Sequence, residues 1–275
     1  MSLDARLTLA RPDLASQDLE GGVRAERFAA PVTRKVVWPS APLRRDPAGA
    51  LDDQLLFGER FDVLDQSGDL AWGQALRDGY VGFVPAAALG DPGEPPTHWV
   101  SAMRTFTFEA PLVRARASGP FSLNTLVRVD LEESGFSRTD AGWIASSHLT
   151  PIGVGRADVV AEMERFLEVP YLWGGRDSLG LDCSGLVQQG LYACGQACPR
   201  DSDQQQSLGR DVNDAARRGD LIFWKGHVGV MLDEARLLHA NAHHMAVAIE
   251  PLAEAEARIL AKGAGPVTCR RRLLG

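Results

Sequence analysis

Residues 182–195 read DCSGLVQQGLYACG, a stretch that decides the fold of the C-terminal part of the chain. Its apolar residues Leu186, Val187 and Leu191 recur at the spacing of one face of an α-helix. Gly195 is a suitable helix stop, because glycine tolerates the left-handed conformation that ends many helices. We therefore predict a helix that starts at the Asp-Cys-Ser-Gly end of the stretch.

A shorter helix precedes this stretch and four strands follow it. ADVVAEMERFLEVP, residues 157–170, places its apolar residues, Leu167 included, on one helical face. A helix followed by an antiparallel sheet is typical of an α+β domain, which we place at residues 151–275. The predicted strands are DLIFW (220–224), HVGVML (227–232), RLLHAN (236–241) and MAVAIEPL (245–252).

The first 150 residues begin with a polar arm and continue with strand-like sequence. We predict an arm at residues 1–24, a first domain at 25–90 and a second at 91–150. AWGQALRDGYVGFVP, residues 71–85, holds two strands around an Arg-Asp-Gly turn. The endings GFVPAAAL (82–89) and GWIASSHL (142–149) match, which suggests a duplicated small β-barrel. A generic β-domain is the alternative.

Composition excludes several classes of protein. The formal net charge of -7 argues against a nucleic-acid surface, which needs a strong basic excess. No apolar run approaches the roughly 18 residues of a membrane helix, so we expect no membrane partner. The first residues, with Asp4 and Arg6, lack the apolar run of a signal peptide, which predicts a cytoplasmic location. The four cysteines have neither zinc-site spacing nor the density of a disulfide framework.

Cys183 is the candidate nucleophile. The thiolate attacks carbonyl groups, and an ordinary cysteine with a pKa of about 8.5 is mostly protonated at neutral pH. The start of a helix stabilises an anion through its free N–H groups and its partial positive charge. A buried cysteine that acts as a small hydrophobe is the alternative. The polar Asp, Ser and Gly that flank Cys183 favour the nucleophile.

Two of the six histidines are placed to serve that cysteine. His227 opens one predicted strand, and His239 lies 12 residues later on the next. A hairpin of this length brings two strand positions side by side, so one imidazole can accept the thiol proton while the other orients it. The alternative for each is a satisfied polar or core histidine. His239, His243 and His244 would suit a metal on a helix, but this segment is predicted to be a strand, so we expect no metal and no cofactor.

Five blocks of sequence resemble the NlpC/P60 family of papain-like peptidases over about residues 156–275. In that family the cysteine is the nucleophile and the histidine of the HVG block is the base, which implies these roles for Cys183 and His227. The third polar residue implies His239 as the orienting group, and the tyrosine of the first block implies Tyr171 near the oxyanion. The blocks are YLWGG (171–175), DCSG (182–185), GDLIFW (219–224), HVGV (227–230) and HA (239–240).

The resemblance also implies substrate-binding residues. Segments 25–90 and 91–150 resemble bacterial SH3-like domains, and a subgroup with two such domains recycles murein peptides. Trp173 is a candidate groove residue, with a core role as the alternative. Tyr80 would contribute from the first barrel, with a hairpin-core residue as its alternative. The remaining implied contacts, for the amine and the carboxylate of a short peptide, are Asp182, Ser184, Arg200, Asp201 and Ser202; for Arg200 and Asp201 the alternative is a solvated surface pair.

The resemblance implies an endopeptidase of cell-wall recycling. By resemblance, its substrate is the γ-D-glutamyl–diamino acid bond, with diaminopimelate as the diamino acid, in a murein peptide that begins with a free L-Ala. An amidase or acyltransferase that uses the same Cys–His pair is one alternative. A catalytically inactive murein-binding module is the other, and it is disfavoured by the intact set of Cys183, His227 and His239.

Overall fold

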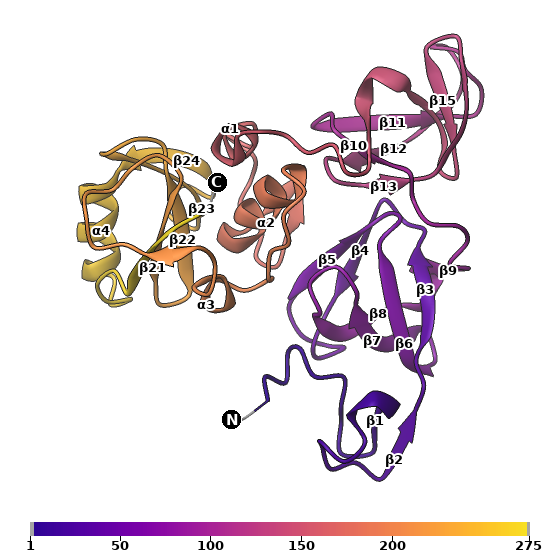
Figure 1. The fold of residues 1–275 in the computed structure, drawn as a ribbon, viewed down its shortest axis with the longest axis horizontal. Coiled ribbons are helices and arrows are strands. Elements are labelled where there is room, and N and C mark those ends of the chain that lie inside the picture. Colours follow the sequence, from indigo (N-terminus) through magenta and orange to yellow (C-terminus); the bar gives the residue numbers. More distant parts are fainter. Residues whose placement is uncertain (1–2, 274–275) are drawn as a thin grey trace. The chain divides into compact units, whose positions relative to one another are not determined.

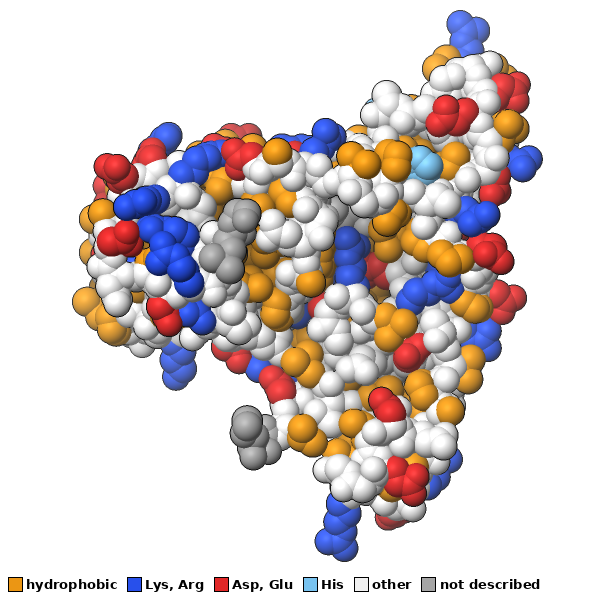
Figure 2. All heavy atoms as spheres, in the orientation of Figure 1, with side chains coloured by type: hydrophobic (Ala, Val, Ile, Leu, Met, Phe, Trp, Pro, Cys, Tyr) orange, Lys and Arg blue, Asp and Glu red, His pale blue; other side chains and the backbone are white. Residues whose placement is uncertain are grey.

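The structure, a computed structural model, describes residues 3–273 (Figure 1). The chain divides into two compact units, one ending at Ile152 and the other starting at Gly153. Strands predominate in the described residues, and helices are few. None of the helices within residues 3–273 is long and apolar enough to cross a membrane. Side chains of both charge signs are interspersed on the face drawn in Figure 2.

The first module of the N-terminal unit is a small barrel-like β-structure. A five-stranded sheet has the order β8-β7-β6-β3-β9, and β4 pairs with β5. Val36, Leu43, Leu55 and Phe61 are fully buried and form its core together with Tyr80. The predicted hairpin is confirmed, since β7 pairs with β8. The strands are β3 (Val32–Val36), β4 (Ser40–Leu43), β5 (Asp53–Leu56), β6 (Arg60–Ser67), β7 (Leu70–Ala75), β8 (Val81–Pro85) and β9 (Leu89–Gly90).

The N-terminal arm lies on this module and forms part of its core. Leu9 and Leu14 are buried against Trp72 and Val81. The guanidinium of Arg11 lies 4.2 Å from the centre of the Trp72 ring, a cation–π contact. Apolar burial therefore ties the arm to the barrel. Its elements are β1 (Leu14–Ser16) and η1 (Gln17–Leu19), and β1 pairs with β2 (Arg27–Ala29), which follows the arm.

The second β-module repeats the ending of the first. In each, a hairpin leads into a single 3-10 turn, and a short strand then pairs back with the module's first strand. Its sheets have the orders β13-β10-β17 and β12-β11-β16-β15-β14. The turns are η2 (Ala86–Ala88) and η3 (Ser146–His148), and the strands are β10 (His98–Val100), β11 (Arg104–Phe108), β12 (Ala117–Ser122), β13 (Leu126–Val127), β14 (Val129–Glu133), β15 (Phe136–Thr139), β16 (Gly142–Ala145) and β17 (Leu149–Pro151).

The C-terminal unit is a six-stranded antiparallel sheet that lies between α2 and α4 in Figure 1. Its strand order is β20-β25-β21-β22-β23-β24, and the four predicted strands are confirmed. The central strands are β21 (Asp220–Trp224), β22 (His227–Met231), β23 (Arg236–Asn241) and β24 (Ala246–Pro251). The remaining elements are α1 (Val159–Glu164), β18 (Arg176–Asp177), β19 (Gly180–Leu181), α2 (Cys183–Ala193), α3 (Ser202–Gln205), β20 (Arg210–Asp211), α4 (Leu252–Ala261) and β25 (Cys269–Arg272).

Helix α2 forms where the sequence predicted a helix. Asp182 caps its first turn by accepting a hydrogen bond from the Gly185 N–H, and Gly195 follows its end with a φ of 73°. Every residue of α2 is buried, so the helix is enclosed by its neighbours on all sides. The preceding helix α1 is shorter than predicted, because the chain turns after Glu164 and leaves Leu167 exposed.

Candidate active site

Cys183 occupies the first position of α2 and is 7% exposed. The backbone N–H groups of Val228 and Ser184 lie close enough to favour the anionic sulfur. Burial, and then the Asp182 carboxylate, outweigh them and raise the thiol pKa to about 12. The expected helix start is present, but desolvation reverses its expected effect on the thiol. The resting sulfur is therefore protonated at neutral pH.

The two predicted histidines meet on adjacent strands. A Cβ placed on Gly229 would lie 3.1 Å from the Cβ of His239, so Gly229 of β22 lies against His239 of β23. His227 lies two residues before Gly229 and therefore on the same face. The Nε2 of His227 is 2.8 Å from the Nδ1 of His239. The predicted pairing across the hairpin is confirmed, and Val228, the residue after His227, contacts the cysteine sulfur through its N–H.

A buried carboxylate, which the sequence analysis missed, extends this pair. His239 is opposite Ala248 on β24, and Glu250 lies two residues further on the same face. The Nε2 of His239 is 2.6 Å from the Oε1 of Glu250. Arg258, from α4, contacts both carboxylate oxygens of Glu250 through its two terminal nitrogens. A single acidic residue in an otherwise apolar strand was the available signal.

Electrostatics keep both imidazoles uncharged. Burial, followed by the neighbouring His239 and Arg258, lowers the pKa of His227 to about 3. Burial also lowers the pKa of His239, although Glu250 acts in the opposite direction. Burial by itself would raise the pKa of Glu250, but hydrogen bonds from Arg258 and His239 hold it well below its ordinary value. At rest, the line of hydrogen-bonded side chains from His227 through His239 and Glu250 to Arg258 therefore holds two neutral imidazoles, one carboxylate and one guanidinium.

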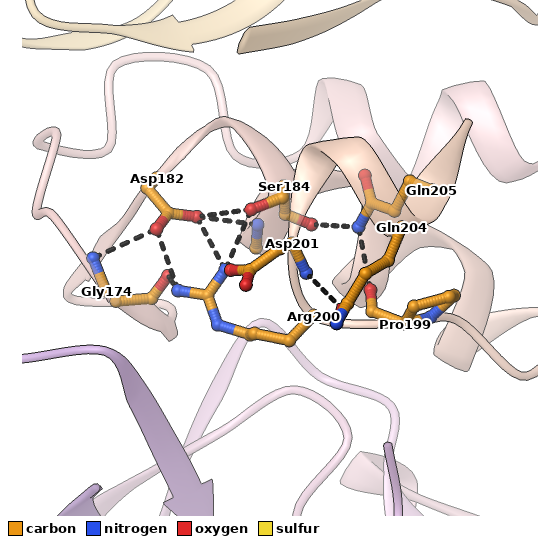
Figure 3. Close-up of polar contacts among 10 residues, drawn as sticks. Gly174, Asp182, Ser184, Pro199, Arg200, Asp201, Gln204 and Gln205 are labelled. Atoms are coloured by element: carbon orange, nitrogen blue, oxygen red, sulfur yellow. Dashed lines mark hydrogen bonds and ion pairs between the residues drawn. The ribbon is translucent and has the colours of Figure 1, made fainter. Parts of the chain in front are cut away.

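Asp182 and Arg200 form a buried ion pair beside the nucleophile (Figure 3). Two nitrogens of Arg200 lie 3.0 and 2.7 Å from the two oxygens of Asp182. The same carboxylate accepts hydrogen bonds from the N–H groups of Gly174 and Gly185, at 2.9 and 2.8 Å. Arg200 is 1% exposed, so its guanidinium is paired with Asp182 away from solvent. The prediction that Arg200 meets a substrate carboxylate is therefore corrected, and the surface-pair alternative fails as well.

The residues around Arg200 brace the start of α2. The Ser184 hydroxyl accepts a hydrogen bond from Arg200 at 2.8 Å and donates to Asp182 at 3.2 Å. Gln205 of α3 donates through Nε2 to the carbonyl oxygen of Ser184, at 3.0 Å (Figure 3). Asp201 is the N-cap of α3 and forms a capping box with Gln204. Ser202, the first residue of α3, is buried, so this block forms a floor beneath the nucleophile's helix.

Tyr171 lies near the nucleophile, and two other segments of the unit hold its backbone. Its N–H donates to the carbonyl oxygen of Met245 at 2.9 Å, and it bridges to Leu181. Burial, and then the charges of Cys183 and Asp182, raise the pKa of the Tyr171 phenol. The phenol therefore stays protonated and can donate a hydrogen bond throughout the working pH range.

The two aromatic residues predicted to contact substrate, Trp173 and Tyr80, differ in their placement, and Trp224 is a third aromatic residue near the histidines. Trp173 is 63% exposed, as a groove residue requires. Trp224 is fully buried, and its ring centre lies 5.7 Å from that of His227, so it supports that imidazole from the core. Tyr80 is 2% exposed within the first module's core. This burial favours the hairpin-core alternative for Tyr80, and its contact with substrate stays a prediction.

Three possible metal ligands lie within 4.8 Å of one another, namely His239, His244 and Glu250. The Glu250 carboxylate is shared between His239 and Arg258. His244 contacts the amide oxygen of Asn241 at 3.0 Å through its Nδ1. These groups already satisfy one another, and a guanidinium beside the carboxylate opposes a cation there.

Comparison with known proteins places this site in a family. Residues 168–258 match the NlpC/P60 family, and residues 43–89 match the bacterial dipeptidyl-peptidase Sh3 domain. The γ-D-glutamyl-L-lysine dipeptidyl-peptidase of Bacillus subtilis is 27% identical over 229 residues, which cover 74% of this chain and 77% of the relative. The peptidoglycan endopeptidase RipB of Mycobacterium tuberculosis is 35% identical over 105 residues, covering 32% of this chain and 44% of RipB.

The fold has a solved counterpart. The crystal structure of an NlpC/P60 family protein from Bacillus cereus aligns with a TM-score of 0.75 at 21% identity, covering 89% of this chain and 100% of that one. The matched residues contain Cys183, His227, His239 and Glu250. The chain therefore carries an NlpC/P60 cysteine peptidase domain, matched over residues 168–258, and a bacterial SH3 domain ahead of it, matched over residues 43–89.

Proposed function

We propose that the chain hydrolyses the γ-D-glutamyl–diamino acid bond of short murein peptides that begin with a free L-Ala. The observation that carries this proposal is the 2.8 Å contact between His227 and His239 next to the strand residue that touches the Cys183 sulfur. In this proposal the neutral imidazole of His227, one residue before Val228, is the general base for the protonated thiol. The relatives named γ-D-glutamyl-L-lysine dipeptidyl-peptidases support the choice of bond.

The reaction has two halves that use the same histidine. His227 takes the thiol proton as the Cys183 sulfur adds to the γ-carbonyl, and the Tyr171 phenol donates to the oxyanion. The C–N bond then breaks, the leaving amine takes the proton from His227, and a thioester remains. Water, deprotonated by His227, attacks the thioester and releases the L-Ala–D-Glu dipeptide and the thiol. His239 holds the His227 ring throughout.

The floor of the site has an orienting role in this proposal. A carboxylate that accepts four hydrogen bonds from Arg200, Gly174 and Gly185 has a fixed position and little free capacity. We assign Asp182 and Arg200 to holding the first turn of α2, with Ser184 between them. The remaining proposed substrate contacts are the exposed Trp173 and, at the start of α3, Asp201 and Ser202.

We also propose that residues 91–150 form a second SH3-like module. The shared hairpin, 3-10 turn and returning strand of η2–β9 and η3–β17 support it, because the matched first module ends in the same way. Two such modules ahead of the peptidase domain favour short, free peptides of murein recycling as substrates over the intact wall.

The test is a cleavage assay with matched peptides. We expect L-Ala-γ-D-Glu-diaminopimelate to yield L-Ala–D-Glu, and Cys183→Ala to release none. Acetylating the L-Ala amine should abolish cleavage, and isolated sacculi should release far less dipeptide than the free peptide does. The L-lysine peptide identifies the preferred diamino acid. Equal turnover by wild type and Cys183→Ala, or equal rates on free and acetylated peptide, would contradict the proposal.

A further inference from the structure

We propose that Glu250, held by Arg258, is a positioning residue that sets the protons on both histidines and so leaves the Nδ1 of His227 free to accept the thiol proton. The inference rests on the proposed roles of Cys183 and His227. It adds two residues to the site, one on β24 and one on α4. Neither carries a role in the mechanism derived above.

The direction of each hydrogen bond follows from the residue at the far end. A guanidinium only donates and an ionised carboxylate only accepts, so Arg258 donates to both oxygens of Glu250. The Nε2 of His239, 2.6 Å from the Glu250 Oε1, must then carry the proton. Because Glu250 is 7% exposed and its partners are buried or half-buried, water offers little competition for these contacts.

The tautomer of His239 fixes the tautomer of His227. A neutral His239 with its proton on Nε2 has a lone pair on Nδ1. The His227 Nε2, at 2.8 Å, must therefore donate to it and carry the proton of that ring. The remaining nitrogen of His227, Nδ1, then has a free lone pair. This is the only tautomer in which His227 can act as a base toward Cys183 while keeping its bond to His239.

Arg258 fixes the direction of these hydrogen bonds. It occupies both carboxylate oxygens, and it lies in the last turn of α4, the helix that packs against β23 and β24. An amide at position 250 would turn its oxygen toward Arg258, since a guanidinium cannot accept a hydrogen bond. The amide NH₂ would then face His239 and reverse every donor in the line. His227 would hold its proton on Nδ1, where it cannot take one from the thiol.

The test compares two substitutions whose order separates positioning from packing. Glu250→Gln keeps the shape but reverses the line, so kcat should fall by about 10²- to 10⁴-fold, the scale on which a wrong tautomer slows acyl transfer, with KM little changed. Glu250→Ala leaves the tautomers unforced and should be the more active of the two. A merely structural role predicts the opposite order, because glutamine replaces the volume and alanine does not.

A rescue variant and a control complete the design. Arg258→Met added to Glu250→Gln frees the amide to turn its oxygen to His239, so activity should recover relative to Glu250→Gln. The control is Glu256→Gln. Glu256 lies on the same helix as Arg258 and pairs with Arg270 of β25, so this variant should cleave like wild type. Circular dichroism melts show which variants are folded.

A spectroscopic measurement keeps this inference separate from the peptidase proposal. Nitrogen-15 NMR of the imidazoles should report the Nε2–H form of His227 in wild type and the Nδ1–H form in Glu250→Gln, whether or not any peptide is cleaved. An unchanged His227 tautomer in folded Glu250→Gln, or activity ranked Gln above Ala, would overturn the role of Glu250. Failure of wild type to cleave would count against the peptidase substrate alone.

Discussion

At the scale of single residues, the buried Asp182–Arg200 pair shows how the site keeps a carboxylate next to its nucleophile. The pair lies at the N-terminus of α2, where Asp182 raises the pKa of the Cys183 thiol and Arg200 lowers it. A buried ion pair contributes little net stability, but removing one partner strands the other charge away from water. The main contribution of Arg200 to stability is therefore that it prevents the Asp182 carboxylate from being buried without a counter-ion.

We predict that Arg200→Met destabilises the catalytic unit by about 3–5 kcal/mol, because it leaves Asp182 charged and without its cation. Urea unfolding followed by fluorescence measures the change. Arg236→Met, which removes an exposed partner of Asp233, is the matched control and should leave the unfolding free energy nearly unchanged. A loss for Arg200→Met no larger than for that control would show that Asp182 needs no counter-ion.

The state of the Cys183 thiol gives a prediction about pH. Burial and Asp182 raise its pKa, so the fraction of thiolate at pH 7 is smaller than for a free cysteine, and ionisation moves to higher pH. Iodoacetamide labelling of the Cys183 peptide, followed by mass spectrometry, should be slow at pH 7 and still rise above pH 9. A rate that reaches its plateau below pH 7 would instead indicate a thiolate paired with a charged His227.

The residues found from sequence differ in kind from those that were missed. Cys183, His227 and His239 stand in blocks with recognisable neighbours, and the hairpin length already implied that the two histidines meet. Glu250 and Arg258 join them only through the β23–β24 register and the placement of α4. Arg200 was identified but given the wrong partner, since no local pattern links it to Asp182, 18 positions away.

At the scale of elements, α2 contains two glycines at which an added Cβ would clash with different kinds of atom. A Cβ on Gly185 would lie 2.4 Å from the carbonyl oxygen of Gly175, which is backbone and cannot turn away. A Cβ on Gly190 would lie 2.5 Å from Cγ of Met163, a flexible side chain on α1. Alanine favours an exposed helix over glycine by about 1 kcal/mol, so the clash decides the sign at each position.

We predict that Gly185→Ala destabilises the catalytic unit and removes most activity, since the loop from Gly174 to Asp182 must shift with the nucleophile. Overpacking of this kind costs about 1–3 kcal/mol. Gly190→Ala, its matched comparison in the same helix, should be milder because Met163 can repack. Thermal melts and peptide cleavage measure both, and equal losses in the two variants would argue that α2 tolerates movement at its start.

Element prediction succeeded where apolar patterns are local. The four central strands alternate or run apolar between turn residues, and the structure has them within one residue of the predicted bounds. The strand β25 reads CRRR, with no apolar pattern, and it exists because it pairs with β21 and each arginine finds a carboxylate. Helix α4 directly continues a predicted strand, so its start was not recognised.

At the scale of the whole molecule, the chain is a series of modules, and Phe57 of the first β-module packs into the core of the second. The matching GFVPAAAL and GWIASSHL endings predicted two related β-modules, and both end in the same hairpin, 3-10 turn and returning strand. The arm could not be predicted in the same way. Leu9 and Leu14 are isolated in a polar sequence, and only their burial against Trp72 makes the arm part of the first module.

The most direct test of the account is to find the covalent intermediate. Wild-type protein is mixed with L-Ala-γ-D-Glu-diaminopimelate, quenched in acid during turnover, digested and analysed by mass spectrometry. We predict an L-Ala–D-Glu acyl group on the peptide that contains Cys183, and its absence from the peptides of the three other cysteines. Peptide cleavage that proceeds with no acyl group on Cys183, or with the adduct on Cys194, Cys198 or Cys269, would contradict it.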